Sequence, residues 1–202
     1  MVWKDLTSEL RHKEIVSAMF VFSLLVVLIF NFSLELDRAT RDNVAAGVLW
    51  VTFVFAATLG LNRTFAAEKD RDLLDGLLLA PIDRSALFVG KLLSTFIFIL
   101  IVESIVVPLF SLLYNVSLFT PLLLAVLVLG TLGYTVAGTL LAAIAIHTRS
   151  REVMLPILLF PVAMPVIMAS VQASAGILEN DALGNISGPL NLVVIYDIIL
   201  FA

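Results

Sequence analysis

The sequence predicts an all-α membrane protein, a bundle of transmembrane helices. Of its 202 residues, 61% are hydrophobic and only 14% are charged, whereas a water-soluble domain has about 45–50% apolar and about 25% charged residues. So little polar surface cannot cover the chain in water. About 20 helical residues cross a bilayer core of roughly 30 Å, so this length allows at most about six or seven crossings and no large soluble domain. The sequence contains no cysteine, which excludes disulfides, zinc–thiolate sites and iron–sulfur clusters formed by these residues.

Six apolar segments predict six spans. The expected spans are 15–34, 44–61, 85–114, 121–146, 153–176 and 190–202. The first is too long for the apolar core of a cleaved signal peptide. The fourth is rich in glycine and alanine, which favour close approach of helix backbones in lipid. The last begins at Leu190 and the sequence stops thirteen residues later, which is about 20 Å of helix and too short to cross. We therefore expect the sixth span to be incomplete, through truncation or because the segment is re-entrant.

The distribution of basic residues predicts a cytoplasmic N-terminus. With that orientation, nine of the twelve basic residues lie in inner segments: Lys4, Arg11, Lys13, Arg63, Lys69, Arg71, Arg84, Arg149 and Arg151. The outer connections hold only Arg38 and Arg41, and Lys91 lies just within the third span. This excess follows the positive-inside rule, which applies because the connections are short.

The connection 62–84 is the longest polar segment and reads NRTFAAEKDRDLLDGLLLAPIDR. Its leucines recur at steps of one and four residues, which places them on one helical face among charged residues. This pattern predicts an amphipathic cytoplasmic helix that ends at Pro81. Its mixed charge suits contact with a protein better than contact with anionic lipid, and a simple interfacial anchor is the alternative. Residues 1–14 have the same character and predict an in-plane elbow helix before the first span.

Four residues within the apolar segments are candidates for function: Glu103, Pro108, Gln172 and Asp197. Glu103 lies near mid-membrane, where a carboxyl group costs at least about 2.5 kcal/mol. It should face a partner helix or a polar cavity, either for function or to form a structural hydrogen bond with Ser104, Thr131 or Tyr134. Gln172 adds a polar group to the fifth span, whose three prolines free backbone carbonyls. The depth of Asp197 is undefined if its span is incomplete.

Three segments carry a resemblance to a known family: KDLTSELRHKE before the first span, FAAEKDRDLLDGLLLAPIDRSALFVGK before the third, and the pair Glu103 and Pro108 within it. Together they resemble the haem exporter protein B family (CcmB) of cytochrome c maturation, over nearly the whole chain and most specifically over 65–91. That family is the membrane subunit of an ABC-type transporter. A looser version of this segment occurs in ABC-2 permeases as the coupling helix that docks on the nucleotide-binding subunit. The short sixth span and the absence of a C-terminal tail depart from the family.

The resemblance implies that a separate, CcmA-like subunit hydrolyses ATP. This chain is therefore expected not to be an enzyme, and it has no P-loop: its one Gly-Lys pair, at Gly90, is followed by leucine instead of serine or threonine. The implied coupling interface comprises Phe65, Glu68, Lys69, Arg71, Leu74, Leu77 and Leu78, with Arg149 and Arg151 from the next inner connection.

The resemblance also implies partners and a location. The partners are haem-handling membrane proteins like CcmC and CcmD, a haem chaperone like CcmE, a second copy of the chain, and the lipid bilayer. The location is the prokaryotic plasma (inner) membrane, with an organellar inner membrane as the alternative. Haem is the implied substrate, yet both histidines, His12 and His147, fall at the inner surface, so no haem site emerges. We expect ATP-driven release of a haem-loaded chaperone, no bound cofactor or metal, and no nucleic-acid partner.

Two other functions stay open. Another ABC-2 permease, exporting lipid, polysaccharide or drug, would share the coupling helix and differ in phenotype. A proton-coupled secondary carrier would use Glu103 as its proton site, but such carriers commonly have two related halves with matching helix breaks. Here the prolines crowd into one span. An intramembrane enzyme is disfavoured because the sequence has neither HExxH nor GxSxG.

Overall fold

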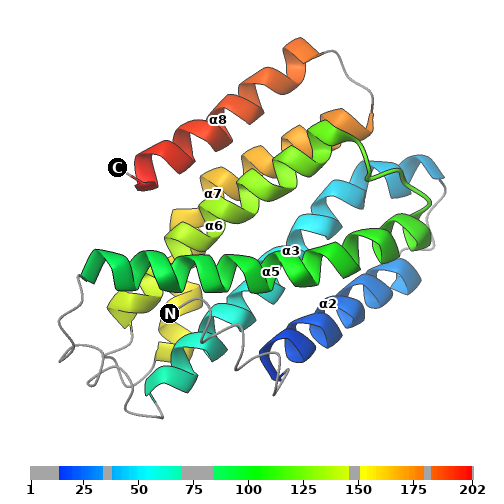
Figure 1. The fold of residues 1–202 in the computed structure, drawn as a ribbon. Helices are drawn as coiled ribbons and strands as arrows, with labels where there is room; N and C mark the ends of the chain where they lie inside the picture. The colour runs from blue at the N-terminus through cyan, green and yellow to red at the C-terminus, as the bar shows by residue number, and fades with distance from the viewer. Residues whose placement is uncertain (1–13, 34–37, 70–83, 146–150, 180–182, 202) are drawn as a thin grey trace.

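The computed structural model of the protein describes residues 14–33, 38–69, 84–145, 151–179 and 183–201, and every regular element in these ranges is an α-helix (Figure 1). The helices are α2 (Glu14–Ser33), α3 (Arg38–Lys69), α5 (Arg84–Tyr114), α6 (Pro121–Ala145), α7 (Arg151–Leu178) and α8 (Leu183–Phe201). All six are long and apolar enough to cross a membrane. The predicted fold class, an all-α bundle with six spans, is confirmed. The cytoplasmic N-terminus stays a prediction, and the elbow helix lies almost wholly outside the described residues.

Two helices differ from their expected bounds by more than two residues. Helix α3 begins at Arg38, six residues before the expected start of its span at Val44. Helix α3 continues past the expected end of its span at Leu61 and runs unbroken to Lys69, since no proline or glycine interrupts residues 61–69. Helix α8 begins at Leu183, seven residues before the expected start at Leu190, and its 19 residues are long enough to cross. The expected incomplete last span is corrected accordingly.

The early start of α8 has a local cause. The stretch from Asn185 to Pro189 has the composition of a turn, but it lies within the first turns of the helix, where Asn185, Ser187 and Gly188 are exposed and Ile186 is buried. Proline removes one helical hydrogen bond to the carbonyl four residues earlier. That carbonyl belongs to the exposed Asn185, near the helix start where surroundings outside the bundle can satisfy it. Ser187 Oγ also donates to the carbonyl of Gly184 at 2.8 Å.

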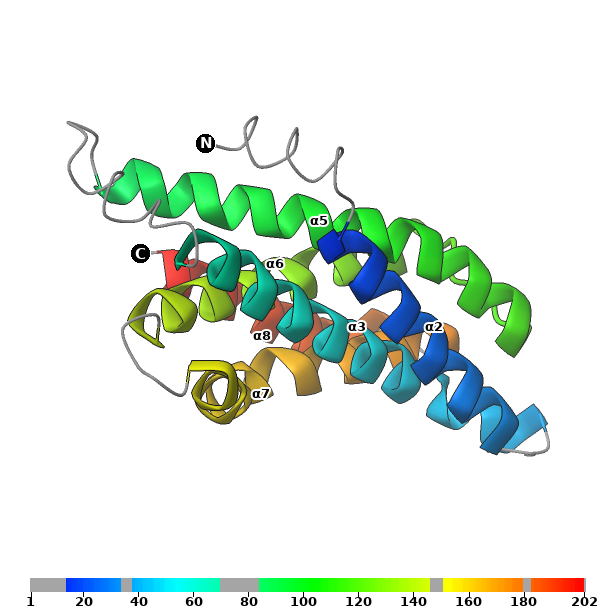
Figure 2. The same ribbon diagram turned by 90° about the horizontal axis from the view of Figure 1, so that it is seen from below.

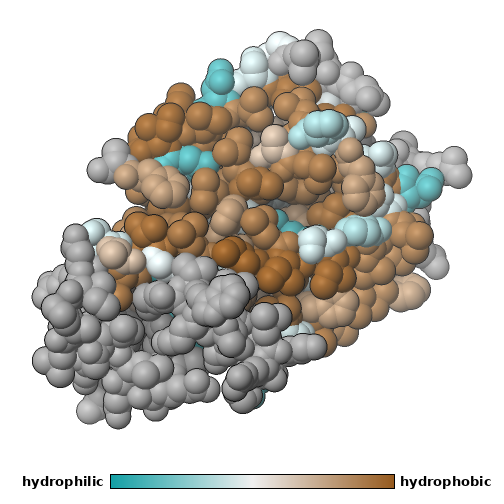
Figure 3. Space-filling view, in the orientation of Figure 1, coloured by the Kyte–Doolittle hydropathy of each residue, from teal (hydrophilic) through white to brown (hydrophobic). Residues whose placement is uncertain are grey.

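The helices are arranged around α3 and α6. Helices α2 and α8 lie at opposite edges of the bundle (Figure 1): α2 packs on α3 and α5, and α8 packs on α6 and α7. Helices α5 and α7 lie on opposite sides of the layer formed by α3 and α6 (Figure 2). The contact between α6 and α7 is the most extensive. Most of the described surface visible in Figure 3 is hydrophobic, as lipid contact requires.

Helix α6 is packed closely on two neighbours, α3 and α7. An added Cβ at Gly130 would collide with Trp50 of α3 and Ser170 of α7, and one at Gly138 would collide with Leu61 of α3. Only a residue without a side chain permits these approaches. The expected close packing of the glycine-rich span is confirmed.

Candidate functional site

Glu103 of α5 is the acidic residue of a polar cluster inside the bundle. Its side chain is only 5% exposed, and Thr131 Oγ1 of α6 donates a hydrogen bond to Glu103 Oε1 at 2.5 Å. Thr131 is one of the three partners suggested by the sequence. Ser104 points elsewhere and donates to the carbonyl of Ile101 at 2.7 Å. The carboxyl group therefore links α5 to α6 within the hydrocarbon layer.

A second polar contact lies beside the first and involves α3. Tyr134 of α6 shares a hydrogen bond of 2.6 Å with Thr58 of α3, in which either hydroxyl can donate. Thr58 Oγ1 in turn donates to the carbonyl of Val54 at 2.7 Å. About two turns earlier on α3, Trp50 Nε1 donates to Ser174 Oγ of α7 at 2.9 Å. Hydrogen bonds thus connect α3 to both α6 and α7.

A cavity of about 10 Å³ lies between these contacts, which is room for one water molecule. Its lining consists of Trp50, Phe53, Val54, Ala57, Ile99, Glu103, Thr131 and Tyr134. Three of the lining residues, Glu103, Thr131 and Tyr134, carry polar groups. Among the residues that the structure describes, no group of three acidic, histidine or cysteine side chains could bind a metal ion. The chemistry available here is hydrogen bonding between helices, each bond contributing about 0.6 kcal/mol in known cases.

The structure does not bring the four candidates together. Pro108 and Gln172 are exposed on α5 and α7 respectively. Asp197 of α8 is only 6% exposed and packs against Gly133 of α6. Gly133 and Thr131 are two residues apart, about 200° around the helix, so Asp197 and Glu103 approach nearly opposite faces of α6.

The predicted coupling interface lies at the margin of the described structure. Phe65, Glu68 and Lys69 belong to the last turns of α3, and Arg151 begins α7, but their side chains are outside the described residues. Outside the described ranges altogether are Arg71, Leu74, Leu77, Leu78 and Arg149. The coupling interface therefore stays a prediction.

Sequence reasoning missed the contacts that join α3 to its neighbours. Thr58 and Ser174 look like ordinary small polar residues, since hydroxyls in membrane helices commonly bond to their own backbone. The available signal was Trp50, because a buried indole N–H needs an acceptor. Its partner, however, lies 124 residues away and could not be read from local pattern.

Six apolar helices held together by internal polar contacts define a multi-pass helical membrane protein. The chain belongs to the family described as CcmB protein, whose family model matches residues 1–199. It is 31% identical over 148 residues to Heme exporter protein B of Rhodobacter capsulatus, covering 73% of this chain and 68% of the relative. It is 28% identical over 153 residues to Heme exporter protein B of Paracoccus denitrificans, covering 75% and 70% respectively.

Proposed function

We propose that this chain is the membrane permease subunit of an ABC transporter complex for c-type cytochrome biogenesis. The observation that carries the proposal is the match to the CcmB family over residues 1–199. The relatives named Heme exporter protein B support a role in haem handling, and the six apolar helices support a permease. The proposed location is a bacterial inner membrane, because the relatives come from bacteria and the chain has six apolar helices.

The energy for this work comes from a separate ATPase subunit that docks on residues 65–78 and on Arg149 and Arg151. The leucine face and mixed charges of the segment suit a protein contact. Helix α3 supports the idea mechanically, because it runs unbroken from the bundle to Lys69. A displacement at its end would reach Thr58 and Trp50, whose hydrogen bonds hold α6 and α7.

The proposed output is release of a haem-loaded chaperone on the outer side of the membrane. The helices that the structure describes contain no histidine, so they offer no internal histidine path for haem. Membrane proteins like CcmC and CcmD would handle haem, a chaperone like CcmE would carry it, and a second copy of this chain would complete the permease.

The test is to replace Glu68, Arg71 and Leu74 together with alanine. We expect normal membrane insertion, loss of the co-purifying ATPase, and loss of covalent haem from c-type cytochromes. The matched control replaces three lipid-exposed residues of α2, Val21, Leu25 and Ile29, and should behave as wild type. Full ATPase recovery and full cytochrome c production in the first variant would contradict the proposed interface. Loss of an exported lipid, polysaccharide or drug with normal cytochromes would identify a different exporter.

A further inference from the structure

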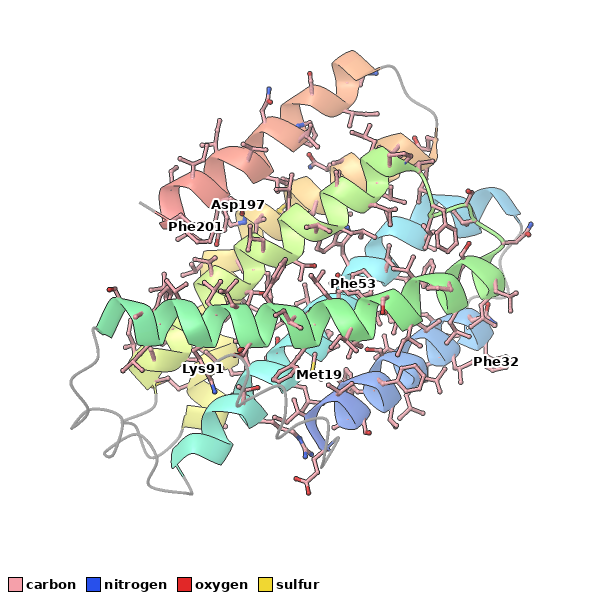
Figure 4. All side chains as sticks on the ribbon, in the orientation of Figure 1. Met19, Phe32, Phe53, Lys91, Asp197 and Phe201 are labelled. Atoms are coloured by element: carbon pink, nitrogen blue, oxygen red, sulfur yellow. The ribbon has the colours of Figure 1, made fainter. Side chains whose placement is uncertain are left out.

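Asp197 is a buried carboxylate for which the described part of the chain provides no hydrogen-bond partner. Its side chain is only 6% exposed, and neither Oδ1 nor Oδ2 has a partner. Figure 4 shows it between α8 and α6. A Cβ at Gly133 would collide with Asp197 Oδ1, so the carboxylate occupies the notch that this glycine leaves. An intramembrane acid of this kind normally pairs with another polar or charged group.

The described side chains of the neighbouring helices offer Asp197 no compensating charge. Helix α8 packs only on α6 and α7 among the described helices. The only charged residues of these two helices are Arg151 and Glu152 in the first turn of α7, and their side chains are outside the described residues. The titratable group of α6 is Tyr134, whose hydroxyl is engaged with Thr58. On α8 itself, Tyr196 donates its hydroxyl hydrogen to the carbonyl of Val162 at 2.9 Å. The described side chains of these helices therefore leave Asp197 without a partner.

Asp197 lies close to the surface of the bundle, although its side chain is only 6% exposed. In Figure 3 a hydrophilic patch interrupts the apolar surface between α8 and α6, where Figure 4 labels Asp197. The α6 face that carries Gly133 continues toward Leu140 and Ile144, since steps of seven and eleven residues return to nearly the same side of a helix. Leu140 is 36% exposed and Ile144 is 64% exposed. We call the surface formed by Asp197, Leu140 and Ile144 the α6–α8 surface. It combines one carboxylate with two lipid-exposed apolar side chains.

We propose that the α6–α8 surface binds a transmembrane helix of another protein that carries a lysine or arginine within the membrane. A basic side chain would supply the positive charge and the N–H donors that the described residues do not offer to the oxygens of Asp197. The apolar strip matches the rest of a transmembrane helix. A free metal cation fits poorly, because among the described residues no second acidic side chain joins Asp197 in a metal-binding group. The inference is independent of the proposed function.

The depth of the basic residue follows from the position of Asp197 on α8. Asp197 lies fourteen residues after Leu183, about 21 Å along the helix. In a hydrocarbon core of about 30 Å it is nearer the side on which α8 ends. A flexible lysine stem reaches it from the centre of a partner helix.

The test uses a defined probe, a polyleucine helix of about 21 residues with one central lysine, and a matched peptide without the lysine. The full chain carries a donor dye on Ser187→Cys, an exposed position of α8 in a sequence without cysteine. Energy transfer in lipid vesicles measures peptide binding. We expect the lysine peptide to bind at least about tenfold more tightly than the leucine peptide. Asp197→Asn should abolish this preference, and Asp197→Glu should retain it.

Glu103→Gln is the matched control, because Glu103 has an internal partner on nearly the opposite face of α6, and it should keep the full preference for the lysine peptide. Equal binding of the two peptides to the wild-type chain would overturn the proposal, as would a preference that survives in Asp197→Asn. If Asp197→Asn instead weakens association between two labelled copies of the chain, the occupant is a second copy and the proposal is wrong.

Discussion

Glu103 and Asp197 are two buried carboxyl groups that pack on nearly opposite faces of the same helix, α6. Glu103 is enclosed where α3, α5 and α6 meet, and Thr131 supplies its hydrogen bond. Asp197 lies on α8 at the edge of the bundle, and the described residues offer its oxygens no partner. Burial alone therefore does not reveal what a membrane carboxyl does. The contrast indicates that Glu103 joins helices within the chain, whereas Asp197 is available to another chain.

The largest expected effect comes from disrupting α6 itself. Gly130→Val should lower the free energy of unfolding by about 3 kcal/mol or more. The added atoms collide with Trp50 of α3 and Ser170 of α7 and force these helices away from α6. Thermal unfolding in mild detergent measures the loss. Gly47→Ala is the control, since nothing lies within 4 Å of its added Cβ. Equal unfolding temperatures for the two variants would show that α6 is not the closely packed centre of the bundle.

An intermediate effect is expected at Glu103. Glu103→Leu should destabilise the chain by about 1–2 kcal/mol, because it removes the acceptor of the Thr131 hydroxyl in a buried setting. Glu103→Gln keeps an oxygen in the same place. Its loss of unfolding free energy should be less than half of the loss caused by Glu103→Leu. Unfolding of both variants in the same detergent separates these outcomes. If leucine and glutamine give the same stability, the hydrogen bond to Thr131 contributes nothing.

The smallest effect, with the opposite sign, is expected at Asp197. Relative to the wild-type chain, Asp197→Leu should leave the free energy of unfolding unchanged or raise it by up to about 1 kcal/mol, because it removes an unpartnered buried carboxyl group. The same unfolding assay applies. A loss similar to that of Glu103→Leu would mean that Asp197 has an internal partner, and the contrast between the two carboxyl groups would disappear.

The sequence was sufficient to predict the six helices, because the hydrophobicity of each segment decides whether it can cross a bilayer. It was insufficient for the start of α8, where Ser187, Gly188 and Pro189 suggest a turn but form helix. Glu103 was recognised from its expected depth, yet choosing Thr131 among three partners required the packing of α5 on α6. The state of Asp197 could not be predicted, since its burial depends on a helix thought too short to cross. Phe65, Glu68 and the rest of the coupling surface rest on local pattern and family resemblance.

We propose that this permease works with a separate ATPase subunit. The most direct measurement is to purify the tagged full-length chain in mild detergent from its native membrane and to identify the co-purifying proteins by mass spectrometry. The account predicts a protein with a P-loop in fixed proportion to the chain, which is lost when Glu68, Arg71 and Leu74 are replaced. Recovery of an intact, folded chain without any P-loop protein would contradict the account.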